Sequence, residues 1–307
     1  MRFRVLGSAA GGGFPQWNCG CANCRGQREG TLDARPRTQE SVAVSGDDGE
    51  HWFLLNASPE IRQQIESFPG LWPRQPRHSP IAGILLNNGD LDHCLGLLSL
   101  RESHPLVAIA TDAMRAGFTD NNILYRTLQR FPDQLRWQIL RAGEEQPLKL
   151  PDGRDSGLAV TAIAVPGKRP LHLEGITAPS PEDCVAFRIR EVATGGTLTY
   201  ASAVGGPSPG VEAAVAGADV VFFDGTFWAA DELPSAGLGT KRAEDMAHWP
   251  VGGADGSLGF LAGLPARRKL LIHINNTNPL LRENSQERQT LSAAGVELAH
   301  DGLEGVL

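Results

Sequence analysis

Long hydrophobic runs, basic clusters and abundant aromatic side chains are all missing from this sequence of 307 residues. The longest apolar stretches, at 81–86 and 269–274, are far too short to cross a bilayer. Aromatic residues make up only 6% of the chain and do not interleave with Lys and Arg, as a stacking groove for nucleic acid would require. We therefore expect neither a membrane span nor a nucleic-acid partner.

A secretory signal is also missing, because the start of the chain is positively charged but has no sustained apolar segment. The content of 41% hydrophobic and 21% charged residues, with a formal net charge of −7, is ordinary for a soluble protein. We expect a cytoplasmic location. Because we find no credible linker and no internal repeat, we expect one domain over residues 1–307. The oligomeric state is left open, a homo-oligomer included.

Short β-rich runs separated by turns indicate the fold class. Strands are expected at 3–6, 41–44, 52–56, 81–86, 160–164, 186–190, 197–201, 219–223 and 269–274. Asp47-Asp48-Gly49 predicts a hairpin between the second and third strands. Helices are expected at 95–102, 211–216 and 285–294, and another is opened by Ser58-Pro59-Glu60 with Ser58 as its cap. Two strand-rich halves with helices between them predict an α/β fold, a four-layer αββα sandwich.

Cysteine is scarce, but three of the five cysteines, Cys19, Cys21 and Cys24, lie within six positions. Such close spacing does not easily close a disulfide without strain, whereas three sulfurs can converge on one tetrahedral ion. We favour a structural zinc over buried apolar cysteines or a redox pair, so that the domain has an N-terminal Cys-rich metal loop. The fourth ligand is not visible in the sequence. Cys94 and Cys184 lie in apolar settings and are expected in the core.

The Gly-rich stretch at 7–13 follows a predicted strand. Its glycines do not fall in the G-x-G-x-x-G register, and Phe14-Pro15 stands where a dinucleotide-binding fold would open a helix. We therefore interpret the stretch as backbone that lines a cleft, or as a tight loop, and not as a phosphate-binding turn.

A second polar cluster directly follows the predicted strand 81–86, at Asn88, Asp90, Asp92 and His93. The carboxyl end of such a strand is where α/β active sites form. At this place the sequence resembles the metallo-β-lactamase superfamily, which carries an H-x-H-x-D-H motif. Asp92 and His93 match the motif, whereas Asn88 and Asp90 stand where histidines would be. The resemblance implies the metallo-β-lactamase fold.

Further along the chain, only part of the superfamily pattern is kept. The next histidine and the bridging Asp are missing, since the chain reads Val165-Pro166-Gly167-Lys168 and Ser202-Ala203 at the two strand ends. The last histidine of the pattern is matched by His273. One of the superfamily's two metal positions therefore lacks its ligands in this chain, and the other is expected to use Asp92, His93 and His273.

Two imidazoles and one carboxylate leave coordination positions open, which suits Fe(II) and oxygen chemistry and also a mononuclear zinc hydrolase. Asp90 is interpreted as a supplementary ligand, a general base or a solvated turn residue. Asp224, after the predicted strand 219–223, either orients a metal-ligating histidine or caps an Asx turn. Asn88 and His248 are candidates for the same supporting role or for contact with substrate.

Several stretches together resemble the family of B proteins of pyrroloquinoline quinone (PQQ) biosynthesis over essentially the full length. They are V-L-G-S-A-A-G-G-G-F-P-Q-W-N-C from Val5, the cysteine triplet, N-A-S-P at Asn56, D-H-x-x-G-L-L at Asp92, D-G-T-F-W at Asp224 and H-I-N-N-T-N-P at His273. The resemblance implies a role in making PQQ, a redox cofactor built from Glu and Tyr side chains.

The same resemblance implies one of two activities. One is hydroxylation of a tyrosine-derived precursor with Fe(II) and O₂, and the other is carriage of PQQ or its precursor toward the periplasm. The ligand count favours hydroxylation, with Asp90, Asp92, His93 and His273 as catalytic residues and an acidic small-molecule precursor against the Gly-rich loop.

The cysteine triplet also resembles that of a phosphonate-pathway cyclic phosphodiesterase of the same superfamily. In that relative, a histidine three residues beyond the last active-site ligand helps to bind the structural zinc. Asn276 stands at that position in this chain. The resemblance therefore supports a zinc site without supplying its fourth ligand.

Overall fold

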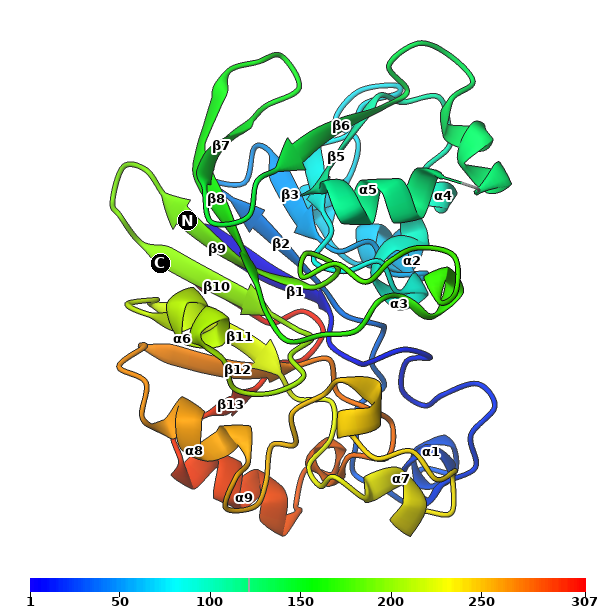
Figure 1. The fold of residues 1–307 in the computed structure, drawn as a ribbon, viewed down its shortest axis with the longest axis vertical. Coiled ribbons are helices and arrows are strands. Elements are labelled where there is room, and N and C mark those ends of the chain that lie inside the picture. The colour runs from blue at the N-terminus through cyan, green and yellow to red at the C-terminus, as the bar shows by residue number, and fades with distance from the viewer. Residues whose placement is uncertain (121) are drawn as a thin grey trace.

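Two seven-stranded β-sheets pack face to face in the computed structural model, which describes residues 1–120 and 122–307 (Figure 1). The first sheet contains, in spatial order, β14 (Glu304–Val306), β1 (Arg2–Gly7), β2 (Ser41–Ser45), β3 (Trp52–Leu55), β4 (Ile81–Leu85), β5 (Leu106–Thr111) and β6 (Leu135–Leu140). The second contains β13 (Glu297–Leu298), β12 (Arg268–Ile272), β11 (Val220–Asp224), β10 (Thr197–Ala201), β9 (Val185–Glu191), β8 (Asp155–Ala164) and β7 (Glu145–Lys149).

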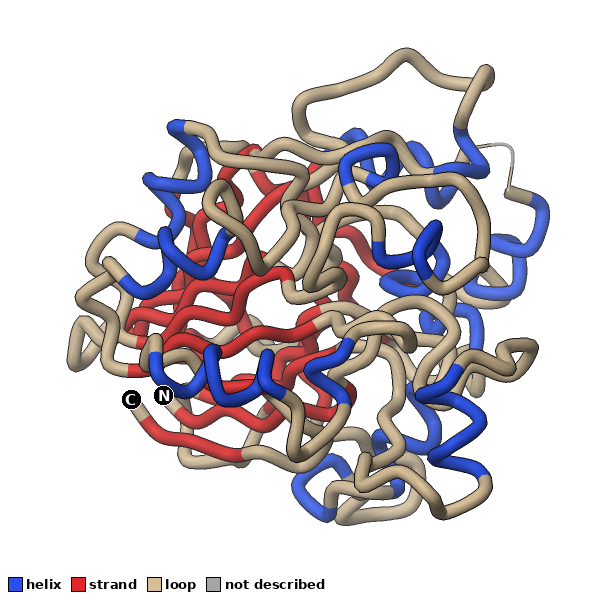
Figure 2. Tube along the Cα trace, turned by 90° about the horizontal axis from the view of Figure 1, so that it is seen from below, coloured by secondary structure: helices blue, strands red, loops and turns tan. Residues whose placement is uncertain are grey.

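Helices cover the outer faces of the sheets, and Figure 2 shows the strands gathered between them. Beside the first sheet lie α2 (Ile61–Glu66), α3 (Leu91–Cys94), α4 (Gly96–Ser99) and α5 (Asp112–Thr119). Beside the second sheet lie α6 (Pro209–Val215), α8 (Ser257–Ala262) and α9 (Gln286–Ala293), with α1 (Ala22–Arg28) and α7 (Glu232–Ser235) near one end. Short 3₁₀ helices occur at Pro69–Leu71, Ile123–Leu128, Leu171–Leu173, Glu244–Met246 and Pro279–Leu281. The predicted four-layer α/β sandwich is confirmed.

The main core lies between the two sheets. Phe3 of the first sheet meets Phe222 of the second edge to face, with ring centroids 5.3 Å apart. The neighbouring residues on β11, Val221 and Phe223, belong to a separate apolar cluster with residues of α6, α8 and α9. β11 is therefore buried on both faces, as expected for an inner strand with parallel neighbours.

Parallel pairing places several strand ends at one edge of the sandwich. β3, β4, β5 and β6 pair in parallel, and so do β10, β11, β12 and β13. Backbone hydrogen bonds join the loops at this edge. The amide of Val185 donates to the carbonyl of Asn87 at 2.8 Å, and the amide of Ala10 donates to the carbonyl of Ile274 at 2.9 Å. The first bond joins the loop after β4 to β9, and the second joins the loop after β12 to the N-terminal loop. The amide of Asn275 donates to the carbonyl of Thr226 at 3.1 Å, which joins the loops after β12 and β11.

All nine expected strands are present, within two residues at their ends except that β8 begins at Asp155, five residues early. The hairpin at 47–49 is also present, because β2 and β3 pair antiparallel and Asp48 and Gly49 both have positive φ. The prediction missed β5, β6, β7, β13 and β14. β7 is an edge strand whose Pro147 and polar residues do not follow a strand pattern.

Two of the helix predictions were wrong in detail. The helix after β3 begins at Ile61, and Ser58 does not cap it, because the buried Ser58 hydroxyl has no partner among the described residues. The expected helix at 95–102 is replaced by α3 and α4, which begin four residues earlier. Asp92 and His93 therefore lie within a short helix. The helices expected at 211–216 and 285–294 are α6 and α9, displaced by two residues at most.

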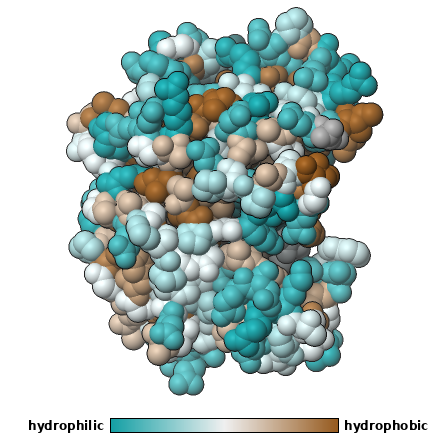
Figure 3. Space-filling view, viewed as in Figure 1, coloured by the Kyte–Doolittle hydropathy of each residue, from teal (hydrophilic) through white to brown (hydrophobic). Residues whose placement is uncertain are grey.

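In the described parts of the chain, 1–120 and 122–307, no helix has the length and apolar character needed to span a membrane. The face in Figure 3 is mostly hydrophilic, with separate hydrophobic patches.

Candidate metal centre

Asp92 and His93 lie in the first turn of α3, immediately beyond the loop that leaves β4. Asn88 shapes this loop, since its Oδ1 accepts a hydrogen bond from the amide of Asp90 at 2.9 Å. The carbonyl of His93 accepts from the amide of Ala57 at 2.7 Å, which ties α3 to the end of β3. His93 is buried, and Asp92 is partly exposed toward the cleft.

His273 comes from the other sheet, directly after β12, with a positive φ of 63°. Its Nε2 lies 3.2 Å from Asp92 Oδ2, and Nε2 of His93 lies 3.5 Å from the same oxygen. Two ligand atoms about 2.1 Å from one ion are separated by roughly 3.0 to 3.4 Å at coordination angles of 90° to 109°. Both distances from Asp92 Oδ2 are close to this range, and the ligand atoms of the three residues lie within 4.8 Å of one another, so the group could hold one metal ion.

A buried carboxylate orients the His93 ring. Nδ1 of His93 lies 2.6 Å from Oε1 of Glu40, which is 1% exposed. Asn56 Nδ2 also lies 2.7 Å from the same Nδ1. Because a carboxylate only accepts, Nδ1 carries the proton and donates it to Glu40. The Asn56 amide then donates to Glu40 Oε1 at 2.6 Å and to Asn87 Oδ1 at 2.8 Å.

Thr226 orients the His273 ring, as Glu40 orients the His93 ring. The Thr226 hydroxyl donates to Oδ1 of Asp224 at 2.6 Å and accepts from Nδ1 of His273 at 2.7 Å. Asp224, fully buried as the last residue of β11, therefore acts on His273 through this hydroxyl. Oδ1 of Asp224 also accepts from the Thr226 amide at 2.9 Å, so Asp224 both forms an Asx turn and orients His273.

This pattern of protons favours a cation between the three side chains. If Nδ1 of each imidazole donates, each neutral Nε2 has a lone pair directed at a carboxylate oxygen 3.2 or 3.5 Å away. Facing acceptors repel unless a positive charge lies between them. The residues present therefore fit a divalent metal ion at Asp92, His93 and His273.

The titration behaviour of the metal-free protein is consistent with this. Burial alone raises the pKa of Asp92, but the charge of His93 and the contact with His273 outweigh it and hold that pKa well below its usual range. Burial alone lowers the pKa of His93, but Asp92 and Glu40 outweigh it and raise that pKa to about 9. Without metal, protonated imidazole supplies the positive charge that the site requires.

A cleft opens above these three residues. Its lining includes both predicted and unexpected residues: Ala10, Gly11, Asn88, Asp90, Asp92, His93, Gly167, Lys168, Ala203, Thr226, Phe227, Met246, Ala247, His248, His273 and Asn275. Asp90 Oδ2 lies 3.9 Å from Nζ of Lys168, and Asp90 Oδ1 accepts from the amide of Leu171 at 3.2 Å. The Gly-rich loop contributes Ala10 and Gly11 to the wall.

His248 lies beside His273, with ring centroids 5.3 Å apart and planes inclined by 26°. Its Nδ1 is 2.6 Å from Oδ2 of Asp224, which leaves Nε2 available to a bound molecule. Asp224, His248 and His273 also form a group with the spacing of metal ligands. Nδ1 of both imidazoles is already engaged by Asp224 or Thr226, so the Asp92 group, which offers the Nε2 atoms of His93 and His273, is the better candidate for a metal ion.

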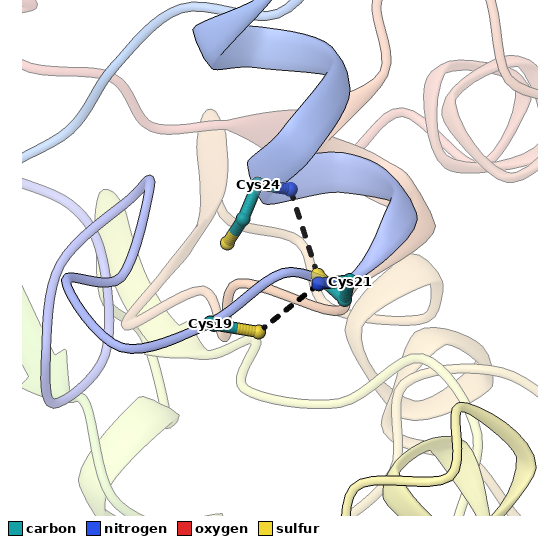
Figure 4. Close-up of side chains that lie close together, drawn as sticks. All are labelled: Cys19, Cys21 and Cys24. Carbon is teal, nitrogen blue, oxygen red and sulfur yellow. Dashed lines mark hydrogen bonds between the residues drawn. The ribbon is translucent and has the colours of Figure 1, made fainter.

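The three N-terminal cysteines converge at a separate place (Figure 4). Cys19 and Cys21 lie in the loop before α1, Cys24 lies in the first turn of that helix, and their sulfurs lie within 4.8 Å of one another. All five cysteines are free. Cys94 and Cys184 are buried among apolar side chains, as predicted.

Sequence reasoning missed Glu40 and Thr226 as partners of the two imidazoles. Thr226 stands in the D-G-T-F-W stretch, two residues beyond an Asp that was singled out, so its position could have been found. Glu40 has no such signal, because it precedes β2 and approaches His93 through the pairing of β2 with β3 and of β3 with β4.

The model of the beta-lactamase superfamily domain matches residues 51–274. The chain is 44% identical to coenzyme PQQ synthesis protein B of Ectopseudomonas mendocina over 308 residues, with 100% of both chains covered. It is 42% identical to the protein of the same name from Bradyrhizobium diazoefficiens, again with 100% of both covered.

Solved structures agree with the sequence comparison. Zn(2+)-bound PqqB from Methylobacterium extorquens has a TM-score of 0.91 and 43% identity, with 100% of both chains covered. A diphosphatase of the PhnP family, at 20% identity and a TM-score of 0.65, covers 100% of this chain and 97% of its own and shares the fold. The chain has the metallo-β-lactamase fold and belongs to the coenzyme PQQ synthesis protein B family.

Proposed function

We propose that this chain acts in PQQ biosynthesis, where it hydroxylates a tyrosine-derived precursor with a metal ion and O₂. The observation that carries the proposal is the convergence of two imidazole nitrogens on one carboxylate oxygen, at 3.2 and 3.5 Å. The names of the relatives support the pathway. Fe(II) held by Asp92, His93 and His273 would supply the activation of O₂ that ring hydroxylation requires.

The buried partners of the ligands keep this donor set in place. Glu40 and Thr226 accept the Nδ1 protons of His93 and His273, so that each ring presents Nε2 to the metal. Gly11 leaves room beside Asp92, because a Cβ atom at residue 11 would lie 3.1 Å from Asp92 Oδ2.

The cleft walls suit an acidic precursor. Lys168 offers a positive charge to a substrate carboxylate, and the Gly-rich loop offers backbone without bulky side chains. Asp224 holds Nδ1 of His248, so His248 Nε2 is placed to exchange a proton with the phenol of the substrate. Asp90, beside Lys168, is the second candidate for a general base.

A mononuclear zinc hydrolase is the second candidate, because the solved relative is Zn(2+)-bound. Two-metal hydrolysis is disfavoured, since Gly167 and Ser202 stand near the strand ends where the second ion would need its ligands. A third candidate is a carrier, which would bind PQQ or its precursor tightly and would not convert it.

The test is oxygen uptake after anaerobic reconstitution with one equivalent of Fe(II), with the tyrosine-derived precursor added last. With a two-electron reductant such as ascorbate in the mixture, hydroxylation predicts uptake of one O₂ for each product molecule heavier by one oxygen atom, because the second oxygen atom is reduced to water. The zinc-loaded protein is the matched control and should consume no O₂. Hydrolysis without O₂ uptake, or tight binding without any product, would contradict the proposal and support the hydrolase or the carrier.

Asp92→Ala and His273→Ala test the site itself. Each removes one ligand, and we expect each to lose at least about 99% of the uptake rate, because a two-ligand site does not retain the ion. Asp112→Ala, an exposed residue on α5, is the matched control. Full uptake by either ligand variant would refute the assignment.

A further inference from the structure

The side-chain amide of Asn276 lies over the three sulfurs of the cysteine cluster. Its Nδ2 position is 3.2 Å from Cys19 Sγ, 3.6 Å from Cys21 Sγ and 3.4 Å from Cys24 Sγ. A single amide group has two hydrogens and cannot direct one at each of three sulfurs. The near-equal distances instead place one terminal atom of Asn276 at the fourth corner of a tetrahedron.

The spacing of this corner is that of a zinc ligand. With zinc–sulfur bonds of about 2.3 Å and a zinc–oxygen bond of about 2.1 Å, a tetrahedral angle separates sulfur from oxygen by roughly 3.6 Å. The three distances of 3.2 to 3.6 Å at Asn276 are close to this value. The nitrogen and oxygen of an Asn amide exchange positions by a flip of the group, which brings Oδ1 to the same corner.

Backbone amide groups surround the three sulfurs. Each accepts one backbone hydrogen bond: Cys19 Sγ from the Cys21 amide at 3.4 Å, Cys21 Sγ from the Cys24 amide at 3.5 Å, and Cys24 Sγ from the Gln16 amide at 3.4 Å. Two of these bonds are drawn in Figure 4. Backbone donors around each sulfur stabilise negative charge and orient the lone pairs that bind metal.

Asn276 is fixed in this position by α1. Asn23 Nδ2 donates to the carbonyl of Asn276 at 3.1 Å and to that of Asn278 at 3.0 Å. The other end of the Asn23 amide accepts from Nε of Arg282 at 2.7 Å. Asn276 is 4% exposed, so its amide is withdrawn from solvent and held against the cysteines.

We propose that Asn276 Oδ1 is the fourth ligand of a structural zinc held by Cys19, Cys21 and Cys24. This inference rests on the thiolate zinc site expected from the sequence and extends it to the loop after β12. Because Asn276 is three residues beyond His273, the zinc ties the N-terminal loop to the segment that carries an active-site ligand. A site closed by four protein ligands is structural, with no open position for chemistry.

The test uses the full-length protein loaded with Co(II), because only the thiolate site produces sulfur-to-cobalt charge-transfer absorption. Zinc competition against that absorption measures the affinity of this site alone. We expect Asn276→Ala to weaken zinc binding at least about tenfold and to shift the cobalt spectrum. Asn276→Asp, which keeps an oxygen ligand, should bind within a few-fold of the wild type.

Asn18→Ala is the matched control, since Asn18 is exposed in the same loop and, among the described residues, its side chain bonds only to that of Gln16. Equal affinity and equal spectra for Asn276→Ala and Asn18→Ala would overturn the inference. Absence of the charge-transfer absorption in the wild type would instead show that the thiolate site itself does not exist.

A second measurement does not depend on the variants folding. Diffraction from wild-type crystals at the zinc absorption edge should locate zinc 2.0 to 2.2 Å from Asn276 Oδ1, the distance typical of an oxygen ligand. Zinc bound to the three sulfurs and a water molecule, with Asn276 turned away, would also overturn the inference.

Discussion

At the scale of single residues, the candidate metal centre depends on two buried acids, Glu40 and Asp224, which lie outside the motif at residues 88–93. Glu40 acts directly on His93, and Asp224 acts on His273 through the Thr226 hydroxyl. Such partners set which imidazole nitrogen carries the proton and therefore which one faces the metal.

Glu40→Gln should weaken binding of the active-site metal by about 10- to 100-fold, because the amide replaces a charged acceptor with a neutral one. Affinity is measured by competition with a chromophoric chelator. Glu304→Gln, at an exposed position of β14, is the matched control and should bind metal as the wild type does. Equal affinity of both variants would show that Glu40 does not orient His93.

At the scale of secondary-structure elements, the site depends on how closely α3 and α4 approach the loop after β3. The Gly96 amide donates to the carbonyl of Ala57 at 2.9 Å. A Cβ atom at residue 96 would lie 2.3 Å from the carbonyl oxygen of Ser58 and 2.7 Å from that of Ala57. Only glycine allows this contact, which lies at the start of α4, two residues after the end of α3, the helix that carries Asp92.

Gly96→Ala should therefore lower the free energy of unfolding by about 1–3 kcal/mol, since the backbone must separate to admit the methyl group. Gly259→Ala on α8, where no atom lies within 4 Å of the added carbon, is the matched control and should be neutral or slightly stabilising. Denaturant unfolding of both variants measures the difference. A stable Gly96→Ala protein with full metal affinity would contradict this account.

A partly buried carboxylate on α7, that of Glu232, makes stability depend on pH. The amide of Trp228 donates to Glu232 Oε2 at 2.8 Å, and the Thr277 hydroxyl donates to its other oxygen. Burial outweighs these contacts and raises the pKa of Glu232 from 4.5 to about 7. A folded-state pKa above the unfolded value means that stability is greatest below about pH 4.5 and is lost as the pH rises through about 7.

Glu232→Gln should be more stable than the wild type by about 2 kcal/mol at pH 8 and nearly equal to it at pH 5, because the neutral amide pays no cost for a buried charge. Denaturant unfolding at both pH values gives the comparison. Glu212→Gln, at an exposed position of α6, should show no such dependence. If Glu232→Gln differed from the wild type by the same free energy of unfolding at both pH values, ionisation of Glu232 would be excluded as the cause of the difference.

At the scale of the whole molecule, the N-terminal loop joins the two sheets. Ala9 forms parallel bridges both to Gln39, before β2, and to Ile274, after β12. The cysteine cluster lies further along the same loop, so zinc at that cluster would stabilise the junction between the sheets.

Zinc should accordingly raise the free energy of unfolding by about 4 kcal/mol when its free concentration is 1,000 times the dissociation constant. Thermal unfolding over a zinc series checks this. His273→Ala, which keeps the cysteines, should retain most of the gain, whereas Cys19→Ser should lose most of it. An equal gain in both variants would mean that zinc does not stabilise the fold through the cysteines.

The sequence was sufficient to predict the fold class and most strands, because alternating and continuous apolar runs report directly which faces are buried. It also identified Asp92 and His93 as candidate ligands and grouped the three cysteines, since those residues are adjacent or nearly so along the chain. It was less informative for β7, whose edge position permits proline and polar residues, and for α3, which is too short to show helical periodicity.

Which distant groups meet depends on the packing of the folded chain. Glu40 reaches His93 across 53 positions and Asn276 reaches Cys19 across 257, whereas the approach of His273 to Asp92, across 181, was expected only from the family resemblance. No local pattern encodes such contacts, because they arise from the packing of one sheet against the other and from the shared edge of their parallel strands.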